Sequence, residues 1–310
     1  MVLCILFICC IINMRENSVW LIWNWNMWVG IGYNLLKHNK ELFILGGHSQ
    51  ENTNYLKENW ALVLDTIEEI CKRVEYVILC LPSSKEVEEV CLNTKWLLTY
   101  ILSNTKIIDC TSSKPESTIR LSQEFWKKWI IFIDAPLTRT PVEAMIWKLN
   151  CILWCKVDQY PMIVDLCNNF CENIFYAGKV GNANAIKLIN NAFTLMNTAI
   201  IWEIIKKTLE MDVDIHTLKE VVSSWWANSP QFQWFMSWLI DWNKDALKFS
   251  LKNAKKDLVY LSELIQDKSS AMSILESIIG LYDASIEKFG PNSTLPYLCW
   301  EKPGYLDPKK

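Results

Sequence analysis

The sequence predicts an α/β domain followed by an all-α domain: an N-terminal Rossmann-type, doubly wound parallel sheet, then a C-terminal helical domain joined to it by a long helix. Two observations carry this prediction. From about residue 19 to residue 176, short apolar runs alternate with amphipathic stretches, the order expected of a parallel sheet covered by helices on both faces. Residues 185–211 instead have helical spacing throughout and contain neither Pro nor Gly.

The expected strands are short apolar runs. They lie at 19–22, 41–45, 75–82, 105–110 and 129–136, and two further runs at 149–154 and 173–178 are expected to extend the same sheet. Helices are expected between them at 28–38, 51–58, 65–72, 84–91, 114–127 and 158–170. After the long helix, of ~40 Å at 1.5 Å per residue, further helices are expected at 214–224, 230–240, 244–264 and 270–288. Asp214 is suited to begin the first of these and Gly290 to end the last.

Residues 1–13 are apolar but lack the basic start and small-residue cleavage site of a signal peptide. We expect them to be an extension without function before a true start at Met14. The two domains are then expected at 14–178 and 179–290, followed by a tail at 291–310 whose last residues, 303–310, are expected to be disordered. No apolar run reaches the ~18 to 20 residues of a membrane-spanning helix. The formal net charge of −3 argues against nucleic acid as a partner.

Cysteine and histidine offer little material for a metal site or a nucleophile. The twelve cysteines contain no C-x-x-C pair, and the pairs Cys151/Cys155 and Cys167/Cys171 have no histidine nearby. Small buried thiols in a reducing cytosol are the simpler interpretation, so we expect a cytoplasmic protein without a metal. Only three histidines occur, so few side chains are available as the base of a Ser-His-Asp or Cys-His mechanism.

The turn after the first strand has unusual residues. A dinucleotide-binding βαβ unit places G-x-G-x-x-G here, because glycine reaches φ > 0 and lets backbone N–H groups approach the pyrophosphate. This chain has Trp23-Asn24-Trp25-Asn26-Met27-Trp28, the same spacing with tryptophan in each glycine place. Three indoles in six residues follow neither a strand nor a helix period throughout, so core packing explains them poorly.

Composition points the same way. The chain has 9 glycines and 17 tryptophans, together 26 of 310, which is about 8% and close to the usual glycine share of ~7%. The codon UGA is read as tryptophan in one genetic code and as glycine in another. We therefore hypothesise that many of these tryptophans are glycine in the natural protein. With tryptophan in the turn, the chain is expected to bind a dinucleotide poorly or not at all.

Further motifs follow in a fixed order along about residues 18–290. They are Asn34-Leu35-Leu36-Lys37, Leu81-Pro82-Ser83, Asp109-Cys110-Thr111-Ser112-Ser113-Lys114-Pro115, Asp134-Ala135-Pro136-Leu137-Thr138, Gly178 to Ala183 with Lys187 and Asn190-Asn191, and Phe249 with Lys256-Asp257. Together with the turn, they resemble the β-hydroxyacid dehydrogenases, the family of 3-hydroxyisobutyrate dehydrogenase and tartronate semialdehyde reductase. Other tryptophans fall on or beside glycine positions of that family: Trp60, Trp129, Trp147, Trp154, Trp225, Trp226 and Trp242.

The resemblance implies roles for four residues. Lys187 would be the general acid/base, because a lysine in a partly buried cleft has its pKa lowered toward neutrality and can donate a proton to a carbonyl oxygen. Asn191, four residues later on the same helix face, would hold the substrate. Thr138 replaces a serine of the family that holds a substrate carboxylate. Arg139 stands where the family commonly has glycine, and either pairs with a second anionic group of the substrate or is an ordinary surface residue.

The resemblance also implies NAD or NADP as cofactor. The position near 47 that selects between them carries neither an acidic residue nor an arginine, so the choice stays open. Lys256 has an alternative interpretation as part of a solvated basic helix face. The residues expected to contact the cofactor are Trp23, Asn24, Trp25, Asn26, Met27, Trp28, His48, Leu81, Pro82, Ser112, Phe249 and Lys256.

The function implied is an NAD(P)-dependent oxidoreductase that interconverts a small 3-hydroxy acid and its semialdehyde. Apolar segments such as 234–240 in the helical domain favour a homodimer or homotetramer. One alternative is a non-catalytic relative that has lost its cofactor loop and serves as a binding or assembly scaffold. The other is an imine reductase of similar fold, a class that usually lacks a lysine at the position of Lys187.

Overall fold

The computed structural model describes residues 17–23, 27–46, 50–93, 96–211, 213–241, 243, 248–265 and 270–298. The chain divides into two compact units, residues 1–187 and 188–310. The division falls inside the long helix rather than near residue 178. The expected extension 1–13 and the expected start at Met14 lie outside the described residues.

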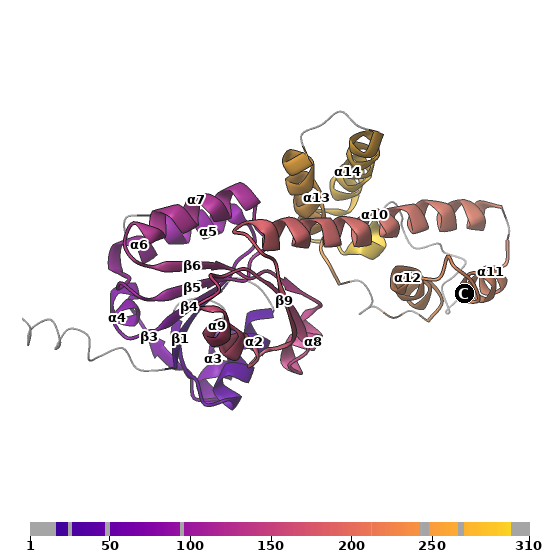
Figure 1. Cartoon of the computed structure of the whole chain (residues 1–310). Coiled ribbons are helices and arrows are strands. Elements are labelled where there is room, and N and C mark those ends of the chain that lie inside the picture. The colour runs from indigo at the N-terminus through magenta and orange to yellow at the C-terminus, as the bar shows by residue number, and fades with distance from the viewer. Residues whose placement is uncertain are drawn as a thin grey trace, which may run out of the picture. The chain divides into compact units, whose positions relative to one another are not determined.

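The first unit contains a six-stranded parallel sheet in the order β3-β2-β1-β4-β5-β6 (Figure 1). Because the chain runs outward from β1 to β2 and β3, then returns to β4 on its other side, β1 and β4 flank a topological switch point. The strands are β1 (Ser18–Trp23), β2 (Glu41–Leu45), β3 (Leu62–Leu64), β4 (Tyr76–Cys80), β5 (Lys106–Asp109) and β6 (Ile131–Asp134). The predicted parallel sheet is confirmed, with β3 as an additional short strand.

Helices cover both faces of this sheet, as period-2 alternation in β1 requires. Val19 and Leu21 pack into one core cluster, whereas Trp20 and Ile22 pack into the other. The helices α2 (Met27–Lys37) and α3 (Gln50–Glu58) contribute buried residues to the first cluster. Buried residues of the second come from α4 (Ile67–Cys71), α5 (Ser84–Leu92), α6 (Leu97–Tyr100) and α7 (Pro115–Trp126). The sheet is therefore doubly wound.

The segments expected to extend this sheet form a second sheet instead. It has the order β7-β8-β9, made of β7 (Leu137–Thr138), β8 (Leu149–Leu153) and β9 (Cys171–Tyr176). After β6 the chain enters β7, which pairs antiparallel with β8, so β8 does not continue the parallel order. A single bridge between Asp134 and Trp154 joins the two sheets. The helices α8 (Pro141–Met145) and α9 (Tyr160–Cys167) complete this part.

The second unit is helical. Its elements are the later part of α10 (Asn182–Glu210), then α11 (Ile215–Ser223), α12 (Pro230–Asp241), α13 (Leu251–Ile265), α14 (Ser270–Phe289) and a short 3-10 turn, η1 (Leu295–Tyr297). Asp214 caps α11 by accepting the Thr217 N–H at 2.8 Å. Gly290, at φ +88°, follows α14. Both predicted helix ends are confirmed.

The tail expected at 291–310 is folded at its beginning. Leu295 and Leu298 are buried in the helical core, and the Leu251 N–H donates to the Ser293 carbonyl at 2.7 Å. These two leucines supply apolar surface that the helices alone do not cover. The rest of the tail, including the segment 303–310 that is expected to be disordered, lies outside the described residues.

By length and composition alone, α10 is apolar enough to cross a membrane, and core helices pass the same test. Its second half is packed as a core helix. Leu188, Leu195, Ala199 and Trp202 recur at helical spacing and are buried in the helical cluster. The Trp202 indole N–H donates to the Leu295 carbonyl at 3.1 Å.

The cysteines in the described part of the chain are free thiols buried in apolar surroundings, so the expectation of small buried thiols is confirmed for them. They are Cys71, Cys80, Cys91, Cys110, Cys151, Cys155, Cys167 and Cys171. Burial raises the pKa of Cys71 and that of Cys80 to about 12. Within the described residues, no group of three or more His, Cys, Asp or Glu side chains is arranged to hold a metal ion.

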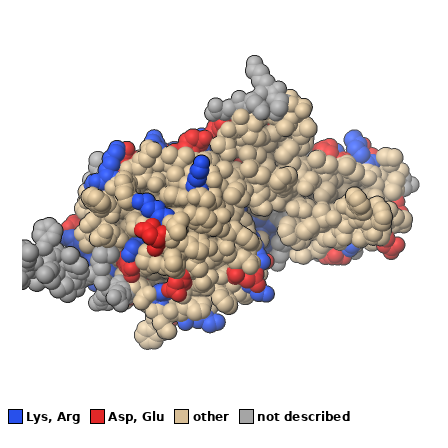
Figure 2. Space-filling view, viewed as in Figure 1, with Lys and Arg blue, Asp and Glu red and all other residues tan. Residues whose placement is uncertain are grey.

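Surface charge is mixed. On the face drawn in Figure 2, lysines and arginines lie interspersed with aspartates and glutamates over the described residues. This face presents no extended basic surface of the kind that a nucleic-acid backbone requires.

Candidate active site

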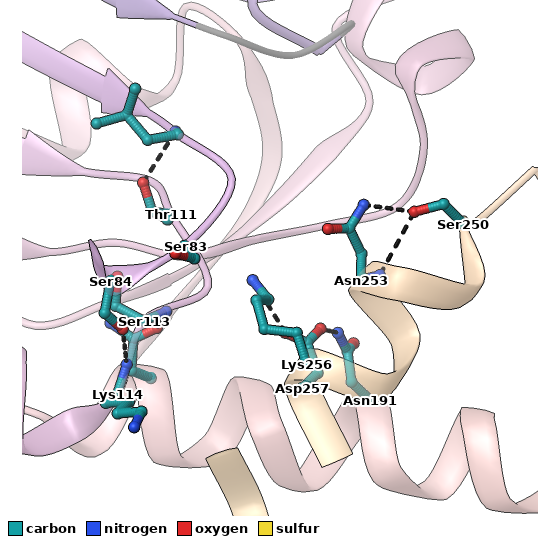
Figure 3. Close-up of polar contacts among 12 residues, drawn as sticks. Ser83, Ser84, Thr111, Ser113, Lys114, Asn191, Ser250, Asn253, Lys256 and Asp257 are labelled. Carbon is teal, nitrogen blue, oxygen red and sulfur yellow. Dashed lines mark hydrogen bonds and ion pairs between the residues drawn. The ribbon is translucent and has the colours of Figure 1, made fainter. Parts of the chain in front are cut away.

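Two loops at the carboxyl edge of the parallel sheet are joined by hydrogen bonds. The Leu81 N–H, just after β4, donates to Thr111 Oγ1 at 3.0 Å, and the Lys114 N–H donates to Ser84 Oγ at 2.7 Å (Figure 3). The structure thus brings together the segments that carry three predicted cofactor residues. Leu81 is buried, and Pro82 and Ser112 beside it are half-buried.

Two buried carboxyl groups end neighbouring strands at this edge. Asp109 ends β5, Asp134 ends β6, and the two are register partners. Both are inaccessible to solvent. Asp109 Oδ1 accepts the Thr111 N–H at 2.9 Å, and Asp109 Oδ2 accepts the Ser113 hydroxyl at 3.3 Å. Asp109 therefore fixes the loop that follows its own strand.

Asp134 instead fixes the start of α10. Its Oδ1 accepts the Asn184 side-chain N–H at 2.7 Å, and its Oδ2 accepts the Asn184 backbone N–H at 3.3 Å. Asn184 Oδ1 in turn accepts the Ser113 N–H at 2.8 Å, so one amide joins the helix to both strand ends. Burial, the largest effect, and nearby Asp109 raise the pKa of Asp134 to about 8, although N–H donors at the start of α10 oppose the shift.

The predicted site residues did not include Asp109, Asp134 or Asn184. A usable signal was present, because an acidic residue ends two neighbouring apolar strands, and the carboxyl ends of parallel strands meet at one edge. Asn184 carried no comparable signal, since its partners are distant in sequence.

Lys187 lies on α10, three residues after Asn184 and therefore about one helical turn further along. The residue is 8% exposed, which fits the predicted buried position. Its role as general acid/base stays a prediction. Four residues later Asn191 belongs to the helical unit, where its side-chain N–H donates to Asp257 Oδ2 on α13 at 2.6 Å (Figure 3).

Two other predicted residues belong to the helical unit. The Lys256 ammonium pairs with Asp257 Oδ1 at 3.2 Å and lies 5.4 Å from the centroid of the Tyr260 ring. Its side chain is 17% exposed, so Lys256 is not part of a solvated basic face. Phe249 is half-buried and packs against the helical core.

The predicted substrate residues Thr138 and Arg139 lie in and beside β7. Thr138 is half-buried, and its hydroxyl oxygen accepts the Asn150 side-chain N–H at 3.2 Å. The Arg139 guanidinium pairs with Glu172 on β9 and donates to the Lys148 carbonyl. Because these contacts are internal to the second sheet, the structure favours a structural role for Arg139 over recognition of a substrate anion.

The fold suits a dinucleotide, but the amino-acid sequence of the loop after β1 does not. Helix α2 begins at Met27, four residues after the end of β1, at the switch point where the pyrophosphate of such a cofactor is bound. Trp28, in the third fingerprint position, lies in the first turn of α2, and its side chain is fully buried in the first core cluster. Asn24, Trp25, Asn26 and His48, with the side chain of Trp23, lie outside the described residues. No glycine occurs from 23 to 28, so this loop lacks the residue type that close approach to phosphate requires.

Comparison with known proteins identifies the domain. Residues 26–178 match the family model described as the NAD binding domain of 6-phosphogluconate dehydrogenase. The chain is 26% identical over 177 residues to the mitochondrial 3-hydroxyisobutyrate dehydrogenase of Mus musculus, an alignment covering 56% of this chain and 52% of that protein. The chain spans about half the length of the curated relatives it matches.

Solved structures share the fold over most of the chain. The structure of Psf3 in complex with NADP+ and 2-OPP has a TM-score of 0.80 at 19% identity, covering 91% of this chain and 98% of that one. A 3-hydroxyisobutyrate dehydrogenase from Salmonella typhimurium has a TM-score of 0.78 at 11% identity, covering 91% and 99%. The predicted cofactor class, NAD or NADP, is confirmed at the level of the domain family. The NAD-binding domain, the fold and the relatives support the predicted resemblance of this chain to the β-hydroxyacid dehydrogenase family.

Proposed function

We propose that this protein is an NAD(P)-dependent oxidoreductase that interconverts a small 3-hydroxy acid and its semialdehyde. The observation that carries the proposal is the placement of Lys187. It is a buried lysine one turn into a helix whose first turn is held by Asp134 and by the loop after β5. Relatives named 3-hydroxyisobutyrate dehydrogenase support the substrate class.

The chain's own residues would bind the substrate and move its proton. Lys187 would donate a proton from its ammonium group to the carbonyl oxygen of the semialdehyde and take it back in the reverse direction. Asn191, on the same helix face, would orient the substrate, and the Thr138 hydroxyl would hold its carboxylate. The nicotinamide, when bound, supplies the hydride.

The test is oxidation of NADH and NADPH against a panel of C3 and C4 semialdehydes. It should use protein with glycine at 23, 25 and 28, so that the cofactor loop does not limit the result. We expect turnover with at least one semialdehyde and one cofactor. Cofactor binding without turnover of any semialdehyde, and without oxidation of the matching hydroxy acids, would contradict the proposal.

A non-catalytic scaffold is the second candidate function. It is favoured by Trp28, whose fully buried indole occupies a glycine position of the cofactor fingerprint. NAD(P)H fluorescence on the natural protein separates the two candidates, because a scaffold that has lost its loop binds neither cofactor.

We further propose that the protein is cytoplasmic and that it forms a homodimer or homotetramer. Phe193, Ile200 and Ile204 lie on one face of α10 at spacings of seven and four residues, and all three are exposed, Phe193 to 70%. A second copy of the chain is the proposed partner for this face, since exposed apolar side chains on one stripe mark an interaction surface.

Introducing charge on that stripe should dissociate the oligomer. The double variant Phe193→Glu/Ile204→Glu is expected to have a lower molar mass in light scattering after size exclusion than the unmodified chain, because each carboxylate would be desolvated at the interface. Ser277→Glu, at an exposed position of α14, is the matched control and should not change the mass. An unchanged mass for the double variant would place the interface elsewhere.

A further inference from the structure

Three tryptophans have a backbone conformation that suits glycine. Among the described residues, seven that are not glycine have positive φ values between +60° and +80°. Four of them are Asn17, Asn39, Asn104 and Arg139, and the other three are Trp60, Trp129 and Trp147. Asparagine tolerates the left-handed region because its short side chain bonds locally, whereas a bulky aromatic residue there is an outlier.

These three residues occupy equivalent places at helix ends. After α3, the Ala61 N–H donates to the Leu56 carbonyl at 2.9 Å and the Trp60 N–H donates to the Lys57 carbonyl at 3.1 Å. This two-bond pattern defines the Schellman motif, in which the residue after the C-cap is left-handed and usually glycine.

The end of α7 repeats both bonds, and the end of α8 repeats the first of them. After α7, the Ile130 N–H donates to the Phe125 carbonyl at 3.1 Å and the Trp129 N–H to the Trp126 carbonyl at 3.0 Å. After α8, the Lys148 N–H donates to the Glu143 carbonyl at 2.9 Å across Trp147. Three independent helix ends thus place tryptophan where the backbone favours glycine.

Packing offers little compensation for this conformation. Trp60 is 88% exposed and Trp129 is 71% exposed, so neither indole buries much apolar surface. Trp147 is about half exposed, and its indole N–H donates to the Asn168 carbonyl. Trp202 provides the contrast, since it is fully buried within α10 and its indole N–H is hydrogen-bonded.

We infer that residues 60, 129 and 147 are glycine in the native protein, through a codon that its source reads as glycine, and that the same reading applies to residues 23, 25 and 28. The native loop after β1 is then Gly-Asn-Gly-Asn-Met-Gly, a loop that accepts the pyrophosphate of a dinucleotide. The helix ends carry the first part of this inference by themselves. Only the dinucleotide at the loop rests on the proposed function.

Peptide mass spectrometry of the protein from its natural source is the direct test. We expect glycine masses at 60, 129 and 147, and also at 23, 25 and 28. Tryptophan masses at the three helix ends would overturn the inference. Tryptophan at the loop alone, with glycine at the helix ends, would overturn its extension to the cofactor site.

A variant series tests the backbone argument on the chain as written. Trp60→Gly and Trp60→Ala both remove the exposed indole, but only glycine relieves the left-handed conformation. We expect Trp60→Gly to raise the urea midpoint of unfolding above that of Trp60→Ala, and the same order at 129 and 147. Trp202→Gly should lower the midpoint, because it empties a packed site. Equal midpoints for glycine and alanine at all three helix ends would contradict the argument.

Cofactor binding, measured separately from turnover, tests the assignment of the loop after β1. The triple variant Trp23→Gly/Trp25→Gly/Trp28→Gly is expected to bind NADH or NADPH at least ten-fold more tightly than the chain as written, measured by fluorescence, with circular dichroism to confirm folding. The matched triple variant at 60, 129 and 147 should gain stability but not binding. Restored binding without turnover would contradict the proposed reaction and leave this inference intact. A folded loop variant that binds neither cofactor would contradict the assignment of the loop.

Discussion

Turnover of a semialdehyde by the Lys187→Ala variant is expected to fall by about 10²- to 10⁴-fold, the usual contribution of a positioned general acid. The background should be the chain with glycine at 23, 25 and 28. NAD(P)H affinity should remain within a few-fold of that background, because the proposed role of Lys187 is proton transfer to substrate. Steady-state rates and fluorescence titration measure the two quantities separately.

Two control variants sharpen this test. Lys187→Arg keeps the positive charge, but a guanidinium does not release its proton near neutral pH, so turnover should remain low. Lys179→Ala removes an exposed lysine just before α10 and should leave turnover unchanged. Full activity in either Lys187 variant would remove Lys187 from the mechanism.

A second large effect is expected on the free energy of unfolding, through Asp134 at the end of β6. The pKa of Asp134 is raised from 3.8 to about 8 in the folded chain, first by burial and then by nearby Asp109. The folded state therefore keeps a proton that the unfolded state releases. The contribution of Asp134 to the free energy of unfolding is fully present below about pH 4 and declines as pH rises toward about 8.

Asp134→Asn should remove this pH dependence, because an amide cannot ionise. One pKa unit corresponds to about 1.4 kcal/mol, so between about pH 5 and about pH 8 the stability of the unmodified chain should fall relative to Asp134→Asn by up to several kcal/mol. Urea unfolding at a series of pH values measures the difference. Asp165→Asn, at an exposed position of α9, should show no such relative change. Parallel stability curves for the unmodified chain and Asp134→Asn would contradict the assignment.

Most of the fold followed from local patterns. The strands of the parallel sheet other than β3 are apolar runs separated by amphipathic helices, and this alternation can be recognised in a single sequence. The three-residue strand β3 was not predicted. The second sheet could not be predicted in this way. The runs at 149–154 and 173–178 look like further parallel strands, and only the antiparallel pairing of β7 with β8 separates them from the first sheet.

The candidate site was predicted less completely. Lys187 was identified by resemblance, and its burial agrees with that role. The contacts of Asn184 with Ser113 and Asp134 join residues far apart in sequence, which no local period reveals. Arg139 was left open between two roles, and only its ion pair with Glu172 on a strand further along the chain distinguishes them.

The packing of residues 295–298 bears on the order in which the protein matures during synthesis. The helical core stays incomplete until Leu295 and Leu298 have emerged from the ribosome, because these two leucines and the carbonyl that receives the Trp202 indole N–H belong to that late segment. A nascent chain stalled before this point would contain a folded sheet domain, followed by helices whose apolar core is incomplete. Such an intermediate is a natural client for chaperones that recognise exposed apolar surface.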